Sequence, residues 1–272
     1  MRAAGTWALV WIALWTTFAS VVPHTPAIPD VALNNAIVAE RLASAGARER
    51  TMLVGSSLIG QLEMPVSSGV LNLGLSAYGA ATGIALVDRA ARLPAVAVIE
   101  TNQLLDAPDS AYAAALLAGA SRRLFGVRAA RLEFRPSTQA IAAVVRATRR
   151  ARRLQPESGR RRAEDRLAAE WATARPDTVG RRAVARWVAA RLRDWQAHGV
   201  RVLLVEVPEH ALVLASAEAR ATRAIVDAEL PPAVFPRLVL AGRDWHTSDA
   251  RHLEADDARA AARALLDSLA RP

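Results

Sequence analysis

The run TMLVG at residues 51–55 is short, almost wholly apolar and closed by a glycine. These features are typical of a strand that is buried on both faces of a sheet. Similar runs follow at residues 69–75 (GVLNLGL), 95–100 (AVAVIE) and 201–207 (RVLLVEV), and residues 235–240 predict a fifth strand. Helix-like segments alternate with them, at residues 31–48, 78–92, 111–120 and 253–270. The alternation predicts an α/β fold, a three-layer α/β/α sandwich around a mainly parallel sheet.

The composition agrees with a globular domain. Hydrophobic residues make up 52% of the 272 residues and charged residues 22%, which is enough apolar material for a core. The chain has no cysteine, so disulfides, cysteine metal sites and a cysteine nucleophile are excluded. Its five histidines form no HExxH motif and no close pair, and we expect neither a metal ion nor another cofactor.

Residues 1–24 predict a membrane anchor or a signal peptide. After Arg2, residues 3–22 carry no charge, and about 20 apolar residues in a helix span a bilayer. Thr17 and Ala19 are small enough for cleavage after Ala19, but the apolar run is long for a signal peptide. We therefore favour a single-pass anchor in the cell membrane with the domain outside the cytoplasm, and secretion is the alternative. Prolines predict a linker at residues 25–35, ahead of a domain at 36–272.

Residues 121–192 hold most of the arginines and predict a helical insertion in that domain. The net charge of +9 and the isoelectric point of about 11.3 suit a nucleic acid or an anionic surface as partner. All 35 basic residues are arginine, however, and alanine is frequent, as GC-rich codons would produce. Runs of charge are usually solvated, so we expect a wet arginine face and no nucleic-acid partner.

Polar side chains gather where the predicted strands end. Ser57 follows the first strand, Asn102 the third, and Asp249 and His252 the last. Ligands of open parallel sheets bind at this edge. A serine, an imidazole to activate it, a carboxylate to orient the imidazole and an amide for an oxyanion together suit acyl transfer. Asp249 and His252 can serve one site if the loop turns helically between them.

Each of these residues also has a purely structural explanation. Ser56 and Ser57 would cap a helix, and Asn102 would stabilise a turn. Asp249 and His252 would begin the last helix as a first-turn acid and a surface histidine. It is less economical for all of these structural explanations to hold at one edge of the sheet than for the residues to form one site. In that site, His246 is the alternative to His252 as the base.

The order of these motifs resembles the SGNH (GDSL-type) hydrolase superfamily. Residues 55–58 (GSSL) match its first block, with Ser56 where the family often has aspartate, and residues 72–76 (NLGLS) match the second. Residues 100–103 (ETNQ) match the third block in Asn102 but lack its glycine and aspartate. Residues 249–252 (DARH) match the last block, Asp-x-x-His. The arginine-rich segment has no counterpart in this resemblance.

The resemblance implies a catalytic assignment. Ser57 would be the nucleophile, His252 the general base and acid, and Asp249 the orienting carboxylate. The oxyanion hole would combine the Asn102 side chain with the backbone N–H groups of Ser57 and of Ala77 or Gly74. The role of Glu100 is left open: it is either a carboxylate that lies behind the site or a residue placed there by packing alone.

The resemblance further implies a serine ester hydrolase or O-acyl (acetyl) transferase. The expected substrate is an acylated cell-envelope or extracellular glycan, with a membrane-bound acyltransferase as a possible partner. A small-ester esterase or lipase is the nearest alternative. A non-catalytic envelope protein that keeps the fold is another.

Overall fold

The computed structural model describes residues 30–45, 50–123, 131–153, 157–173, 178–240 and 244–270, together with residues 7, 10, 11, 13, 14 and 17. Its centre is a five-stranded sheet of order β2-β1-β3-β4-β5, in which all neighbouring strands are parallel. The parallel α/β architecture is thus confirmed, and each strand falls close to a predicted run. The strands are β1 (Thr51–Ser56), β2 (Val70–Leu75), β3 (Val96–Glu100), β4 (Arg201–Val205) and β5 (Arg237–Leu238).

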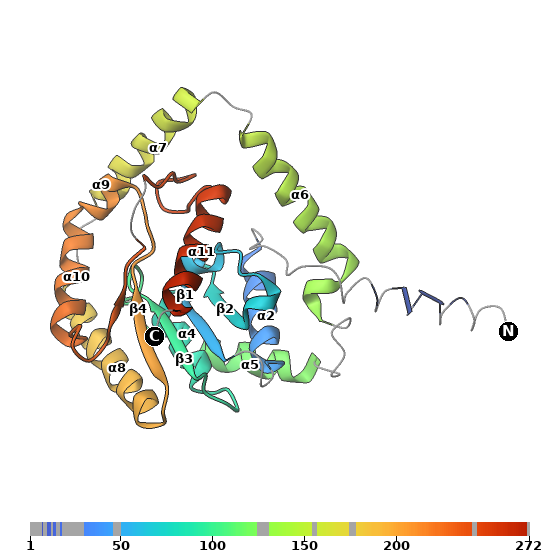
Figure 1. Cartoon of the computed structure of the whole chain (residues 1–272), viewed down its shortest axis with the longest axis horizontal. Coiled ribbons are helices and arrows are strands. Elements are labelled where there is room, and N and C mark those ends of the chain that lie inside the picture. Colours follow the sequence, from blue (N-terminus) through green and yellow to red (C-terminus); the bar gives the residue numbers. More distant parts are fainter. Residues whose placement is uncertain are drawn as a thin grey trace.

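Helices cover both faces of this sheet (Figure 1). Successive side chains of a strand point to opposite faces, so Met52 and Val54 of β1 join one core and Leu53 the other. The first core includes residues of α2 (Val31–Ala43), α4 (Ala80–Val87), α5 (Ser110–Arg123), α8 (Thr178–Ala197) and α10 (Ala217–Glu229). The second includes residues of α3 (Ser57–Gly60) and α11 (Ala255–Ala270).

The strand order reverses beside β1. The chain passes outward from β1 to β2 and then returns across β1 to β3. The connection after β1 enters the α3 face, whereas the chain after β3 enters the face that holds α5 and α8. Connections that separate in this way open a crevice at the carboxyl ends of the two strands, where ligands of such sheets bind.

The arginine-rich region divides into two structural parts. α8 belongs to the sandwich, because Val188, Leu192 and Trp195 are buried in the first core. The other part consists of η3 (Leu132–Phe134), α6 (Pro136–Arg153) and α7 (Glu157–Ala172). In Figure 1, α6 and α7 extend beyond the layers of the sandwich. The segment that lies outside the sandwich is therefore shorter than the insertion expected at 121–192 and comprises the region of α6 and α7.

The folded domain starts before residue 36. Asp30 caps α2 by accepting the Leu33 N–H at 2.9 Å, so this helix takes in residues expected in the linker. The anchor or signal peptide expected at 1–24 lies almost entirely outside the described residues. Across the part of the chain that the structure describes, no helix has both the length and the apolar character to cross a membrane.

Candidate active site

Ser57 stands at the carboxyl end of β1, where it is the first residue of α3. Ser56 caps this helix, since its Oγ accepts the Leu58 N–H at 3.1 Å. Gly60 and Gly74 let α3 lie directly on β2, because a Cβ on Gly74 would clash with the Gly60 backbone. This close approach fixes the start of α3, and Ser57 with it, at the carboxyl edge of β1 and β2.

The imidazole of His252 lies between Ser57 and Asp249. Its Nε2 is 2.8 Å from Ser57 Oγ, and its Nδ1 is 2.8 Å from Asp249 Oδ2. An ionised carboxylate only accepts hydrogen bonds, so Nδ1 carries the proton and Nε2 is left to accept the Ser57 hydroxyl. The fold thus joins three of the residues that the sequence singles out in one chain of hydrogen bonds, although Ser57 and His252 are 195 positions apart.

The loop that carries Asp249 and His252 is bent and not helical, and it still brings the two side chains to one site. It closes through an antiparallel bridge between Thr247 and Leu253, and α11 begins only at Ala255. Ala250 has a φ of 70°, a left-handed conformation that is uncommon for alanine. With this bend, Asp249 Oδ1 accepts the N–H of Arg251 at 3.1 Å and that of His252 at 2.7 Å.

These hydrogen bonds keep Asp249 ionised at neutral pH. Burial alone would raise the pKa of its carboxyl, but the hydrogen bonds from His252 and Arg251 outweigh burial and lower this pKa to about 2. The side chains of His252 and Asp249 are 36% and 45% exposed. The imidazole of His252 is therefore oriented by a charged group and is still open to solvent.

A second left-handed turn lies after β2, at Ala77, where φ is 61°. Among the described residues, Ala77 and Ala250 are the two non-glycine residues with positive φ, and such backbone concentrates at functional sites. Asn35 of α2 clamps the turn, because its side chain accepts the Ser76 N–H at 2.8 Å and donates to the Ser76 carbonyl at 3.0 Å. Sequence reasoning missed Asn35, which falls in the expected linker.

Two of the predicted oxyanion donors are engaged elsewhere. The Gly74 N–H donates to Asn72 Oδ1 at 3.0 Å. The Asn102 amide donates to the Val207 carbonyl at 2.9 Å and to Glu209 Oε2 at 2.6 Å. Both amide hydrogens are used in this way, so the oxyanion role expected of Asn102 is not met in this structure. Asn102 instead fastens the segment after β4 to the end of β3.

Glu100, the last residue of β3, is fully buried behind Ser56. Its carboxylate accepts the Ser56 N–H at 2.7 Å, the Ser56 hydroxyl at 2.9 Å and the Gln103 N–H at 3.3 Å. Burial raises the pKa of Glu100 to about 7, against the lowering effect of the Ser56 hydrogen bonds and with a further increase from Glu209. Gly55 makes room for this side chain, since a Cβ there would lie 2.5 Å from Glu100 Oε2.

His246, the alternative base, faces a different carboxylate. Its Nδ1 lies 3.1 Å from Asp257 Oδ2, and its Nε2 lies 3.3 Å from a guanidinium nitrogen of Arg161. Arg161 belongs to α7. The contact with the Ser57 hydroxyl is made by His252, as the Asp-x-x-His spacing predicts.

α7 packs against the loop that carries His252. Glu164 accepts both the N–H and the hydroxyl of Thr247, and the Arg251 guanidinium lies 5.0 Å above the centre of the Trp171 ring. Arg251 Nε also donates to Glu209 at 2.6 Å. Part of the arginine-rich region, expected to be only a solvated face, thus supports the loop that carries His252.

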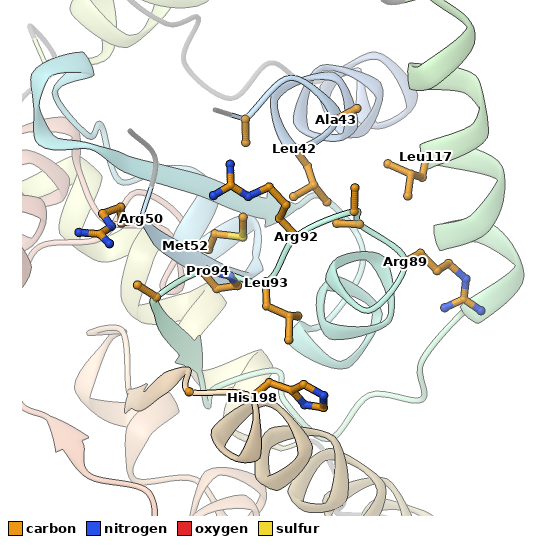
Figure 2. Close-up of a pocket in the computed structure, with 15 residues that line it drawn as sticks. Leu42, Ala43, Arg50, Met52, Arg89, Arg92, Leu93, Pro94, Leu117 and His198 are labelled. Carbon is orange, nitrogen blue, oxygen red and sulfur yellow. The ribbon is translucent and has the colours of Figure 1, made fainter. Parts of the chain in front are cut away.

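Two cavities lie away from Ser57. One of about 420 Å³ adjoins Asn102 and Glu209 at the carboxyl ends of β4 and β5. Figure 2 shows another, of about 450 Å³, near the amino ends of β1 and β3, with arginines around it. Arg50 and Arg89 point to opposite sides of this second cavity, so their charges do not converge on one ligand.

The chemistry of the site follows from its groups. A hydroxyl bound to an imidazole, which in turn donates to a carboxylate, is equipped to attack an acyl carbon. Within the described ranges, no group of three or more histidine, aspartate or glutamate side chains could hold a metal ion. Comparisons of the chain with protein-family models, with curated proteins and with solved structures find no match.

Proposed function

We propose that the protein is a serine ester hydrolase or O-acyltransferase of the SGNH type. The observation that carries the proposal is the pair of 2.8 Å hydrogen bonds from His252 to Ser57 and to Asp249. The place of Ser57 at the carboxyl end of β1, where the strand order reverses, supports it, because ligands of doubly wound sheets bind at such a point. The substrate we propose is an acylated envelope or extracellular glycan, and a small ester is the alternative.

The reaction has two halves. As Ser57 Oγ attacks the ester carbonyl carbon, His252 Nε2 takes the hydroxyl proton and the carbonyl oxygen becomes an oxyanion. The intermediate then expels the alcohol, which leaves with the proton from His252, and Ser57 keeps the acyl group. In the second half, water or a sugar hydroxyl attacks the acyl-serine while His252 takes its proton. The acid or the new ester then leaves as Ser57 Oγ regains that proton from His252. Asp249 stabilises the imidazolium in both halves.

The backbone N–H groups of Ser57 and Ala77 are the oxyanion donors of this proposal. Ser57 begins α3 directly after β1, and Ala77 lies in the turn after β2, the neighbouring strand, so both are at the same edge of the sheet. A backbone donor does not depend on side-chain identity, so alanine at position 77 serves as well as glycine if it keeps its φ of 61°.

The test is hydrolysis of p-nitrophenyl acetate by the full chain and by Ser57→Ala. We expect Ser57→Ala to lose activity by about 10⁴-fold or more, as other enzymes do when the serine of such a triad is removed. Ser268→Ala is the matched control, since the Ser268 hydroxyl only donates to the Ala264 carbonyl within α11. A serine-reactive fluorophosphonate should add to the parent and to Ser268→Ala. An adduct of equal yield on Ser57→Ala would reject Ser57 as nucleophile.

A non-catalytic binding role is the second candidate, and the engaged Asn102 amide favours it. A protein that only binds an acylated glycan needs the fold but not a reactive serine. The parent chain, shown by circular dichroism to be folded, would then give neither hydrolysis nor a fluorophosphonate adduct. Either signal, if absent from Ser57→Ala, decides for the enzyme.

A further inference from the structure

Glu100 differs in its partners from two other buried acids of the described chain, Glu133 and Glu209. Glu133 pairs with Arg41 at 2.6 Å, and Glu209 pairs with Arg251 at 2.6 Å. The hydrogen bonds of Glu100 come instead from Ser56 and from the Gln103 N–H. A buried carboxylate that is held by neutral donors costs free energy to keep, so its position needs a reason beyond packing.

The contacts of Glu100 surround the nucleophile. The carboxylate accepts both the N–H and the hydroxyl of Ser56, which directly precedes Ser57. The same hydroxyl oxygen accepts the N–H of Leu58, which directly follows Ser57. The carboxylate, the Ser56 hydroxyl and the Leu58 N–H thus form one chain of hydrogen bonds that fixes the backbone on both sides of Ser57.

We infer that Glu100 is a positioning residue, which holds Ser56 and Leu58 so that the Ser57 hydroxyl points at His252. This inference rests on the proposed function of Ser57. Glu100 acts through Ser56 and does not touch the reacting atoms. Its effect is on the geometry of attack, in which a displacement of about 1 Å costs up to roughly 10²-fold in rate.

The strand register explains how the carboxylate reaches this place. Val54 pairs with Ile99, so Glu100 follows directly beside Gly55 on the neighbouring strand. A Cβ on Gly55 would lie 2.5 Å from Glu100 Oε2 and 2.8 Å from its Cβ. The acid on β3 therefore requires a glycine on β1. By the same geometry, an acid carried at position 56 would reach this space if position 100 had no side chain.

The ionisation of Glu100 alters the same hydrogen bonds. An ionised carboxylate needs the Ser56 hydroxyl as a donor, which leaves the oxygen lone pair for Leu58. A protonated carboxyl can itself donate to the Ser56 oxygen, and the Ser56 hydroxyl proton then has to turn to the other carboxyl oxygen or away from the pair. The charge that acts on Glu100 is that of Glu209, in the segment after β4, which is itself paired with Arg251. The contacts of Glu100 on β1 and α3 are uncharged.

The first experiment compares Glu100→Gln with the parent in steady-state hydrolysis of p-nitrophenyl acetate across pH 5 to 9. We expect kcat to fall by about 10- to 100-fold with KM within about twofold, and the rate of fluorophosphonate addition to fall in parallel. An ionisation near neutral pH should also disappear from the kcat profile. Glu229→Gln on α10, a residue that pairs with surface arginines, is the matched control and should behave as the parent.

The second experiment moves the acid from β3 to β1. Glu100→Gly alone should be at least as impaired as Glu100→Gln, and Ser56→Asp combined with Glu100→Gly should recover activity to within about tenfold of the parent. A folded double variant no more active than Glu100→Gly overturns the inference, as does a Glu100→Gln variant with unchanged kcat and pH profile. A parent without any Ser57 adduct refutes the proposed function instead, so the two failures are distinct.

Discussion

The two halves of the candidate site are held in different ways. Ser57 is fixed from inside the sandwich, by the junction of β1 with α3 and by the buried contact between Ser56 and Glu100. His252 is carried on an irregular loop, which Asp249 folds locally and α7 supports from outside the sandwich. The proposed nucleophile therefore depends on the core of the sheet, whereas the proposed base depends on peripheral contacts. Changes to the two halves should separate stability from activity.

Among the residues that hold Ser57 and His252 in place, the largest effect is expected at Asp249. Asp249→Asn should lower kcat by about 10⁴-fold, because an amide no longer fixes the tautomer in which Nε2 of His252 accepts the Ser57 proton. The side chain is 45% exposed, so the melting temperature should change little. Steady-state hydrolysis and thermal unfolding measure the two quantities, with Asp267→Asn on α11 as control. A loss of less than tenfold would show that Asp249 does not orient the base.

The next largest effect is on the pH dependence of stability, and it comes from Glu100, which lies behind Ser57. The folded chain keeps a proton on Glu100 up to about pH 7, while the unfolded chain loses it near pH 4.5. Between these values the folded state binds more protons, so this group makes the free energy of unfolding fall as the pH rises. The shift corresponds to about 3 kcal/mol between pH 4 and pH 8.

Glu100→Gln should lack this contribution. Urea unfolding of parent and variant at several pH values measures it, and the difference in unfolding free energy between them should change by up to about 3 kcal/mol across this range. A difference that is constant with pH would show that Glu100 titrates as it does in the unfolded chain. Activity need not follow stability here, because the variant also loses the contact that aligns Ser57.

A smaller effect is expected from the support of the His252 loop. Glu164→Gln weakens the contact of α7 with Thr247, and Trp171→Ala removes the ring beneath Arg251. Since contacts of this kind are worth about 1–2 kcal/mol, each variant should lose roughly 5- to 30-fold in kcat/KM. The melting temperature should stay close to that of the parent, because α7 lies outside the two cores.

The control for this pair is Glu170→Gln, an exposed acid on the same helix. It should keep the parent's activity. If Glu164→Gln and Trp171→Ala also keep it, α7 is only a solvated insertion, as the arginine content suggests. If both variants unfold the protein, the contacts of α7 stabilise the whole fold, and the distinction drawn between the Ser57 side and the His252 side is wrong.

The sequence predicts one half of this comparison better than the other. Buried parallel strands appear as short apolar runs, so β1, β3 and the place of Ser57 follow from local pattern. Asp249 and His252 are recognised from their spacing in the sequence. The bend at Ala250 between them cannot be predicted, because alanine rarely adopts a positive φ.

Contacts between distant residues are the part that local pattern does not contain. Asn102 resembles an oxyanion donor until Glu209, 107 positions later, is seen to take its amide. Glu100 appears as the end of an apolar strand, and only the sheet register brings it to Ser56. α8 is hidden in a similar way, because its many arginines mask the buried stripe of Val188, Leu192 and Trp195.

The smallest effect is expected at Ala77, whose backbone N–H is a proposed donor to the oxyanion. A left-handed alanine costs about 1–2 kcal/mol, and glycine removes this cost but adds about 0.5–1 kcal/mol of backbone entropy. Ala77→Gly should therefore be stable to within about 1 kcal/mol of the parent and should keep its kcat, since the N–H is retained. Ala77→Val also keeps the N–H but resists a φ of 61°, so it should lose both stability and kcat. Equal activity in the two variants would mean that the turn does not hold the oxyanion donor, and that the nucleophile's own N–H acts without it.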